Sequence, residues 1–460
     1  PSDEAYRQFH TFTQEVRLQG EAFNGTLDWL VGGFFANEKL TVRDNLRFGN
    51  QYGRFATCRI ISGGGLAGLY SPTNPLCVAP GVGPATIAAA TGASGADIVA
   101  AFTALDGLNN RGSTNDRYFQ DGTNWALFTH NIINITDRLA LTLGLRYTND
   151  DKDFSATFGN DNTVCTTVQG LVLDDLSSPN ATARALAGAL IGLSCQGNST
   201  AELNNVSIRD TRSEDEWTGT AILSYKATDD LLLYASYARG YKAGGFNLDR
   251  SALKSPILPF AATPGGAQAL VGNLQFEPEL ADSYELGAKY ATGPFSVSLA
   301  AFRSDFSNFQ LNTFNGTVFL VQSINGCKGD LVGGPDSDTD TSAATGACAA
   351  GDVSWGVRTE GVEIETQINP TADLNLTAGL TYADTRYRDD LVGSSAGAPL
   401  DPALRKLPGD NLSNAPEYVV TGSIAWTPAI GGNGLSALFY FDGRYTSQFN
   451  TGSDLFPQKE

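Results

Sequence analysis

The chain has 460 residues, and its 30 basic and 49 acidic side chains give a net charge of −19. An isoelectric point near 4.5 and the lack of a basic run exclude nucleic-acid binding, which needs a positive surface to meet phosphates. No stretch approaches the ~18 consecutive apolar residues of a transmembrane helix. The Ala-rich segment Thr86–Leu105 comes nearest, but glycine, serine and aspartate interrupt it. The mean hydropathy of −0.15 still fits a membrane β-barrel, whose strands alternate apolar and polar residues.

Alternation of apolar and polar residues is the strongest pattern in the chain. In Arg138–Thr148, RLALTLGLRYT, the leucines and the tyrosine fall on one face and the other residues on the opposite face. The same period recurs in Asp373–Ala383 and Tyr418–Thr427, and with charged residues on the second face in Tyr284–Tyr290 and Gly361–Ile368. A period of two is typical of a β-strand rather than a helix.

Twelve strands are predicted in chain order. They cover residues 6–20, 26–41, 117–134, 138–155, 213–227, 230–242, 280–291, 294–312, 356–369, 373–388, 415–428 and 434–448. Such strands exceed the usual ~5–6 residues of globular sheets and reach the ~9–11 residues that cross a bilayer at a tilt.

The connections between these strands alternate between short and long. The short ones are 21–25, 135–137, 227–229, 291–293, 369–372 and 428–433, and the long ones are about 42–116, 156–212, 243–279, 313–355 and 389–414. Outer-membrane barrels have short periplasmic turns and long extracellular loops, and closure leaves no unpaired sheet edge in hydrocarbon. An all-β fold is therefore predicted, a transmembrane antiparallel β-barrel; a soluble sheet with one face in water is the alternative for each strand alone.

The two faces of the strands have different predicted surroundings. Lipid should contact Leu141, Leu143, Leu376, Leu380 and Ile424, whereas Arg146, Lys289, Glu363 and Glu365 should point into the lumen. Aromatic residues near the strand ends suit the two membrane interfaces. These residues are Trp29, Trp125, Trp217, Tyr225, Tyr290 and Trp426.

The six cysteines fall two by two within three of the long loops. The simplest of the 15 connectivities pairs Cys58 with Cys77, Cys165 with Cys195 and Cys327 with Cys348. Disulfides form in an oxidising compartment, such as the periplasm or the cell surface. A zinc site is not predicted, because the chain has no CxxC spacing and only two histidines.

The segment Leu231–Asn247, LLLYASYARGYKAGGFN, resembles a strand and loop of TonB-dependent outer-membrane receptors, particularly the sphingomonad-like type. Phe12–Leu18, Asn134–Asp150, Phe276–Tyr290 and Ser413–Tyr418 resemble other barrel segments of that family. The resemblance covers nearly all the strands and little of the loops. It covers the barrel portion only, since we find no N-terminal plug, TonB box or C-terminal aromatic residue in these 460 residues.

The resemblance implies a receptor in the bacterial outer membrane that takes up a scarce, large solute with energy from TonB, acting through a plug and TonB box outside this chain. A ferric siderophore complex is the commonest substrate of the family, and cobalamin, haem and oligosaccharides are alternatives. Membrane lipid and lipopolysaccharide are the other expected partners. A passive porin-like or adhesive barrel and a soluble secreted β-protein are the competing hypotheses.

Enzyme motifs are weak in this chain. The segment Gly63–Gly68 matches GxGxxG, but it lies within a long predicted loop rather than between a strand and a helix. Gly393–Gly397, GSSAG, matches a nucleophile elbow, but no helical pattern follows. Both histidines, His10 and His130, lie in predicted strands, so no base is evident. We predict no catalytic residue, no cofactor and no enzymatic activity.

One acidic segment is a weak candidate for calcium. Asp336, Asp338 and Asp340 would supply oxygen ligands, but the glycine and closing glutamate of an EF-hand are missing. A solvated acidic loop is the alternative.

The direction of the strands predicts an incomplete barrel. The first strand ends and the twelfth begins at a short turn, so both chain ends should lie on the extracellular side. About 22 strands are typical of plugged outer-membrane transporters. Residues 1–460 are therefore expected to be an interior part of such a barrel, with an open arc of twelve strands.

Overall fold

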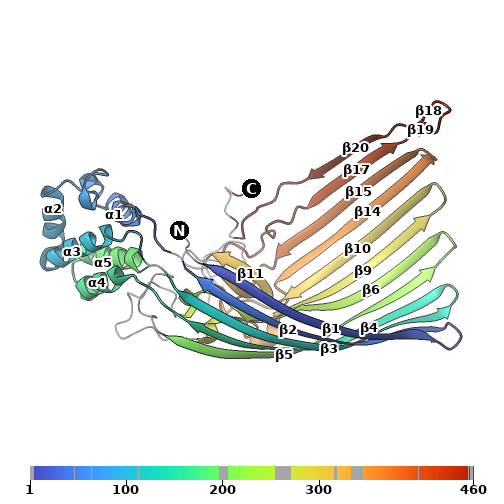
Figure 1. Cartoon of the computed structure of the whole chain (residues 1–460), viewed down its shortest axis with the longest axis horizontal. Coiled ribbons are helices and arrows are strands. Elements are labelled where there is room, and N and C mark those ends of the chain that lie inside the picture. Colours follow the sequence, from blue (N-terminus) through green and yellow to red (C-terminus); the bar gives the residue numbers. More distant parts are fainter. Residues whose placement is uncertain are drawn as a thin grey trace.

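A twelve-stranded antiparallel sheet dominates the computed structural model of the chain (Figure 1). The structure describes residues 5–45, 47–63, 65–111, 114–195, 206–253, 271–314, 319–332, 346–401, 404–453, 455 and 459. The strands of the sheet are β1 (Tyr6–Ala22), β2 (Leu27–Asp44), β3 (Asp116–Thr136), β4 (Leu139–Thr157), β5 (Ser207–Lys226), β6 (Leu231–Lys242), β9 (Glu279–Ala291), β10 (Phe295–Ser307), β14 (Val357–Thr371), β15 (Leu374–Tyr387), β17 (Tyr418–Trp426) and β20 (Phe439–Thr446). Each strand pairs with the next one along this series, so the twelve predicted strands and their order are confirmed.

The predicted strand 294–312 is wrong in its second half. β10 ends at Ser307, and Asn308 has a φ of 50°, a left-handed conformation that asparagine tolerates better than most residues. After Asn308 the chain leaves the twelve-stranded sheet and enters a small second sheet. This sheet contains β11 (Phe309–Phe314), β12 (Phe319–Cys327), β13 (Val353–Ser354) and β16 (Leu391–Val392).

The predicted strand 434–448 begins late. A two-stranded hairpin of β18 (Ala429–Ile430) and β19 (Leu435–Ser436) precedes β20. Gly431 and Gly434, with φ of 68° and 76°, form its turn, because glycine adopts positive φ without steric cost.

All short turns lie at one end of the sheet and the long connections at the other (Figure 1). Two of the long connections are helical rather than irregular. The first contains α1 (Tyr52–Gly63), α2 (Val82–Thr91) and α3 (Gly95–Asp106), and the second contains α4 (Thr163–Val172) and α5 (Ala181–Ser194). We call these five helices the helical unit; their shared core contains residues of both connections.

Specific polar contacts join the two connections within the helical unit. Asn180 caps α5 by accepting from the amides of Thr182 (2.9 Å) and Ala183 (3.1 Å), and it donates to the Ala90 carbonyl (3.0 Å). The Tyr52 hydroxyl donates to the carbonyl of Leu193 at 2.7 Å. Burial raises the pKa of Tyr52, so this donor keeps its proton.

The helical run Val82–Asp106 has 25 residues, and an 18-residue window of it has a mean hydropathy of 1.3, which is long and apolar enough to cross a membrane by length and composition alone. Gly92, with a φ of 64°, separates α2 from α3. Ile87, Ile98 and Phe102 from this run pack into the core of the helical unit.

The three disulfides have the expected pairing. Cys58 is bonded to Cys77, Cys165 to Cys195, and Cys327 to Cys348. The first two lie in the helical unit, and the third joins Cys327, the last residue of β12, to Cys348. Each bridge closes a loop within one connection, which stabilises a folded loop by about 2–4 kcal/mol in chain-entropy estimates.

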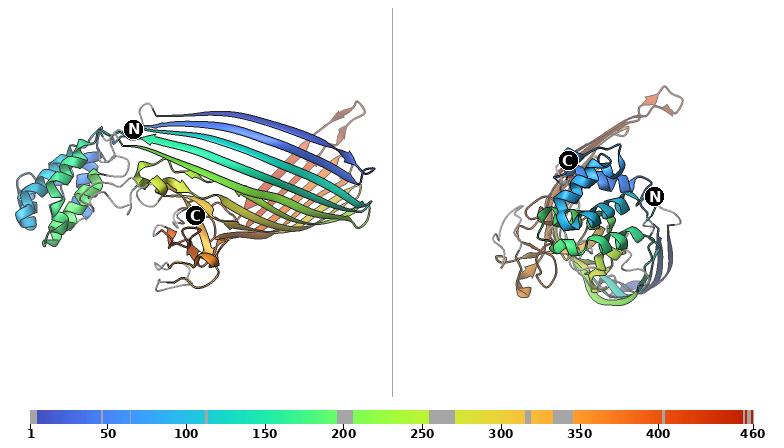
Figure 2. Two further views of the ribbon diagram at one scale, coloured as in Figure 1. Left: turned by 90° about the horizontal axis from the view of Figure 1, so that it is seen from below. Right: turned by 90° about the vertical axis from the view of Figure 1, so that its left-hand side faces the viewer.

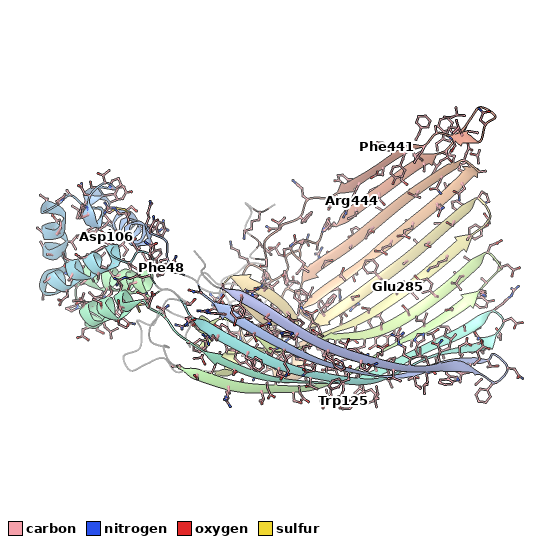
Figure 3. All side chains as sticks on the ribbon, in the orientation of Figure 1. Phe48, Asp106, Trp125, Glu285, Phe441 and Arg444 are labelled. Carbon is pink, nitrogen blue, oxygen red and sulfur yellow. A yellow bond between two sulfur atoms is a disulfide. The ribbon has the colours of Figure 1, made fainter. Side chains whose placement is uncertain are left out.

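The convex face of the curved sheet is apolar and ringed by aromatic side chains. Trp125 projects from this face (Figure 3). The Trp125 ring lies 5.4 Å from that of Tyr147, which lies 5.0 Å from that of Trp217. Trp125 and Trp217 lie near the middle of β3 and β5 rather than near the strand ends as predicted. Further pairs in this row are Phe12–Phe35, Tyr237–Tyr284 and Tyr382–Tyr418. At the short-turn end, Tyr290 packs against Phe295 and Trp426 against Phe439. Such rows suit the two interfaces of a bilayer.

The residues predicted to face lipid share this convex surface. Leu143 lies on the same face of β4 as Tyr147 because side chains alternate along a strand. The register continues the face through Leu380 and Val420, and through Leu376 and Ile424. Leucine, valine and isoleucine thus fill the zone between the two aromatic rows.

The sheet is an open arc rather than a closed ring (Figure 2). Within the described residues, β1 pairs only with β2, and β20 pairs only with β17. The two outer strands therefore present unpaired backbone groups along their free edges.

Leu143→Arg should impair assembly, because Arg near the middle of the lipid-facing zone costs about 2–4 kcal/mol. Thr142→Arg, one residue away on the concave face, is the matched control and should be tolerated. The measurement is the amount of folded protein in outer-membrane fractions, read from its heat-dependent mobility in gels. Equal loss in both variants would contradict the assignment of the faces.

Candidate functional site

The concave face of the sheet is lined by polar side chains that pair across strands. Hydroxyl pairs join Ser283 to Ser304 (2.8 Å), Thr359 to Thr385 (2.7 Å) and Thr377 to Ser423 (2.6 Å). A surface of this kind holds water and polar solutes, whereas the convex face excludes them. The concave face is therefore the candidate solute passage.

The residues predicted to point inward lie on this face. Lys289 is opposite Ser298, which is opposite Glu365, so these residues form one row across β9, β10 and β14. Glu363 lies in the next row, opposite Ala300. Arg146 lies over the rings of Phe34 (5.4 Å) and Phe128 (5.6 Å). Acidic and basic groups thus face the passage together.

A compact polar group surrounds Tyr234 in the middle of this face. The Tyr234 hydroxyl donates to the carboxylate of Glu285, and Lys289 lies 5.7 Å from the centre of the Tyr234 ring. Gly287 is opposite Tyr234 in the register. A Cβ at this glycine would collide with the ring, so the tyrosine can lie flat against the wall only because residue 287 is glycine.

At the long-loop end, two connections pack onto the concave face of the sheet. We call the described part of the β6–β9 connection, residues 243–253 and 271–278, the mouth loop. Its strands β7 (Gly245–Phe246) and β8 (Gln275–Phe276) pair with each other. Phe246 stacks on Phe154 of β4, with ring centres 4.6 Å apart. The buried cluster around this stack combines wall residues Val42, Tyr118, Phe154, Ala156 and Ile208 with Phe246, Leu253, Leu274 and Leu320 from the loops.

Polar bonds also hold the mouth loop in place. Gly244 donates its amide to Glu214 (2.8 Å), and Arg212 donates to Glu214 (2.9 Å) and to Gln275 (3.3 Å). Asn247 both donates to and accepts from the backbone of Val321 in β12, at 3.0 and 2.7 Å. The mouth loop and the β11–β12 hairpin therefore form one assembly.

The enzyme-like motifs lie in long connections of the sheet, whereas both histidines lie in its strands. Gly63 ends α1, and Gly68 lies in a 3₁₀ turn, so no strand precedes the GxGxxG pattern. In GSSAG, the Ser395 hydroxyl donates to the carboxylate of Glu277 at 2.6 Å. His10 lies in β1 and His130 in β3.

The calcium candidates Asp336, Asp338 and Asp340 lie outside the described residues. Within the described ranges, no group of three or more His, Cys, Asp or Glu side chains is arranged to hold a metal ion. The calcium site stays a prediction.

The mouth loop is the part of the site that the sequence pattern missed. A signal was present: Tyr118, Phe154 and Ile208 are apolar residues on the otherwise polar face, near the long-loop ends of their strands. Apolar side chains at such positions indicate that another segment covers the wall there.

Gly287→Ala should destabilise the polar group around Tyr234, since a Cβ in a packed position typically costs about 1–3 kcal/mol. Gly293→Ala, at a turn glycine with open space around it, is the control. We expect the folded form of Gly287→Ala to be lost at a lower temperature in gel mobility assays. Equal melting of both variants and the parent would contradict the described packing.

Comparisons with known proteins agree with this architecture. The family model "TonB dependent receptor-like, beta-barrel" matches residues 2–458. The pesticin receptor of Yersinia pestis is 28% identical over 121 residues, which are 26% of this chain and 15% of that receptor. The crystal structure of the ferric yersiniabactin uptake receptor of Yersinia pestis is similar in fold, with a TM-score of 0.52 and 12% identity, over 97% of this chain and 44% of that one.

The chain thus spans less than half the length of these relatives. The family is one of transport receptors rather than enzymes, and its β-barrels lie in the outer membrane of Gram-negative bacteria. This outer-membrane chain belongs to the TonB-dependent receptor β-barrel family.

Proposed function

We propose that the protein forms part of an outer-membrane receptor that takes up a scarce, large solute with energy from TonB, and that the solute is a ferric siderophore complex. The family match over residues 2–458 supports this proposal most directly. The name of the structurally similar Yersinia pestis receptor, which concerns uptake of ferric yersiniabactin, favours a ferric chelate.

The two faces of the sheet have distinct roles in this proposal. The convex face holds the wall in lipid, and the concave face offers the solute hydroxyl, carboxylate and ammonium groups in place of water. In this proposal TonB acts through a plug and a TonB box, and the strands described here contribute the passage and its mouth.

Further strands complete the wall in this proposal. The free edges of β1 and β20 would leave backbone N–H and C=O groups unpaired in hydrocarbon, which is costly. A barrel of about 22 strands would pair both edges and leave room for a plug.

The convex face also carries charged groups that would contact lipid and lipopolysaccharide in the outer leaflet of the membrane. In the aromatic row, the Tyr237 hydroxyl donates to Asp282 (2.7 Å), and Arg239, two residues further along β6, lies 3.3 Å from the same carboxylate. Arg358 pairs with Asp305 at 2.6 Å on the same face. These charged groups would lie at headgroup level, where they contact lipid and lipopolysaccharide.

Uptake of iron-55 supplied as a panel of ferric siderophores tests the proposed function. Cells that carry the receptor gene should accumulate one member of the panel, and deletion of either the receptor gene or tonB should abolish that uptake. Uptake that persists without TonB would instead indicate the passive porin-like alternative. A surface-adhesion phenotype without uptake of any chelate would indicate the adhesive one.

A further inference from the structure

A fully buried ion pair joins the mouth loop to the long-loop end of the twelve-stranded sheet. The guanidinium of Arg250, in the mouth loop, donates to both carboxylate oxygens of Asp116 in β3, at 2.9 and 2.6 Å. Both side chains are inaccessible to solvent, with 0% of Arg250 and 3% of Asp116 exposed. The guanidinium also lies 5.2 Å from the centre of the Phe158 ring.

The same ion pair contacts the segments that lead into the helical unit. We call residues 114–116 and 158–162 the neck. The Asp116 carboxylate accepts from the amide of Gly159 (3.2 Å), and Arg250 donates to the carbonyl of the same glycine (3.3 Å). Asn115 donates its amide to that carbonyl at 2.8 Å. Arg250 therefore forms hydrogen bonds with both segments of the neck, through Asp116 in one and Gly159 in the other.

The neck continues directly into the helical unit. Asn162 caps α4 by accepting from the amide of Cys165 (3.1 Å), and it donates to the carbonyl of Ser194 at the end of α5 (2.7 Å). The Cys165–Cys195 disulfide fixes the same two helix ends. Gly159 is only three residues before Asn162, which is hydrogen-bonded to both helices. A displacement of α4 and α5 would therefore also displace Gly159.

We propose that Arg250 and Asp116 act as a clasp that couples the position of the mouth loop to that of the helical unit. Separating the pair would leave a buried charge without its partner, which is strongly unfavourable. The mouth loop and the neck therefore move together rather than independently. A contact made by the helical unit outside the membrane would then alter the width of the passage.

The consequence for solute entry rests on the proposed transport function, but the coupling itself does not. Hydrogen–deuterium exchange of the protein in its membrane measures the coupling without any solute. Failure of TonB-dependent uptake would overturn the transport function, whereas the exchange pattern alone decides on the clasp.

Arg250→Gln should accelerate exchange by at least about tenfold both in Gly245–Leu253 and at the amides of Asn115 and Gly159, because local opening frees these amides. The core of the helical unit and the wall strands should be unchanged. Arg303→Gln, which removes an exposed ion pair with Asp305 on the convex face, is the matched control and should change none of these rates. Unchanged exchange in Arg250→Gln, or acceleration in the mouth loop alone, would overturn the clasp.

A milder variant decides the case if Arg250→Gln does not fold. Arg250→Lys keeps the charge but cannot form the two-pronged bond, so the same two segments should exchange faster by a smaller factor.

A second test perturbs the helical unit and measures exchange in the mouth loop, because coupling acts equally in both directions. Replacing Cys165 and Cys195 by alanine should accelerate exchange in Gly245–Leu253 when Arg250 is present and add nothing in Arg250→Gln. Equal acceleration in both backgrounds would contradict the proposal.

Discussion

Backbone hydrogen bonding in a medium without water determines this architecture. Each strand must pair its N–H and C=O groups with a neighbour, because unpaired groups in hydrocarbon cost several kcal/mol each. The sequence meets this requirement with long strands joined alternately by short turns and long connections, and each strand pairs with the next one in the series. The period of two follows from the same pairing, since it places alternate side chains in lipid and in the passage.

The end with the long connections obeys a different requirement, because it lies outside the hydrocarbon. There the protein builds ordinary packed cores. The helical unit has its own core and two disulfides, and the mouth loop packs on the inner wall through Phe246 and Leu274. The buried pair Arg250–Asp116 lies where these two assemblies meet the rim. This position makes it the natural point for coupling between them.

The strands could be predicted from the sequence because a single repeating pattern specifies them. Leu141, Leu143 and Leu145 alternate with small or polar residues, and no other contact overrides that pattern in the membrane. The alternation of apolar and polar residues predicts less about the segments that lie outside the membrane. Asn308 ends β10 through its own backbone conformation, which the apolar residues around it do not reveal. The pairing of cysteines within each loop was predicted because two of them fall in each of three long connections, and pairing within a connection is the simplest of the 15 connectivities.

The helical unit and the clasp could not be predicted in the same way. The helical unit depends on contacts between connections far apart in the chain, such as Asn180 with Ala90. Arg250 and Asp116 are 134 residues apart, and neither belongs to a recognisable motif. Long-range packing of this kind leaves only an indirect trace in the sequence, as with the apolar Phe154 on a polar face.

The placement of the convex face in lipid is the central claim, and fluorescence quenching of Trp125 tests it most directly. The four other tryptophans are replaced by phenylalanine, and the protein is reconstituted with lipids brominated on their acyl chains. Our account predicts strong quenching of Trp125 by the brominated lipids and little quenching by aqueous acrylamide. Strong quenching by acrylamide, with none by the brominated lipids, would contradict it.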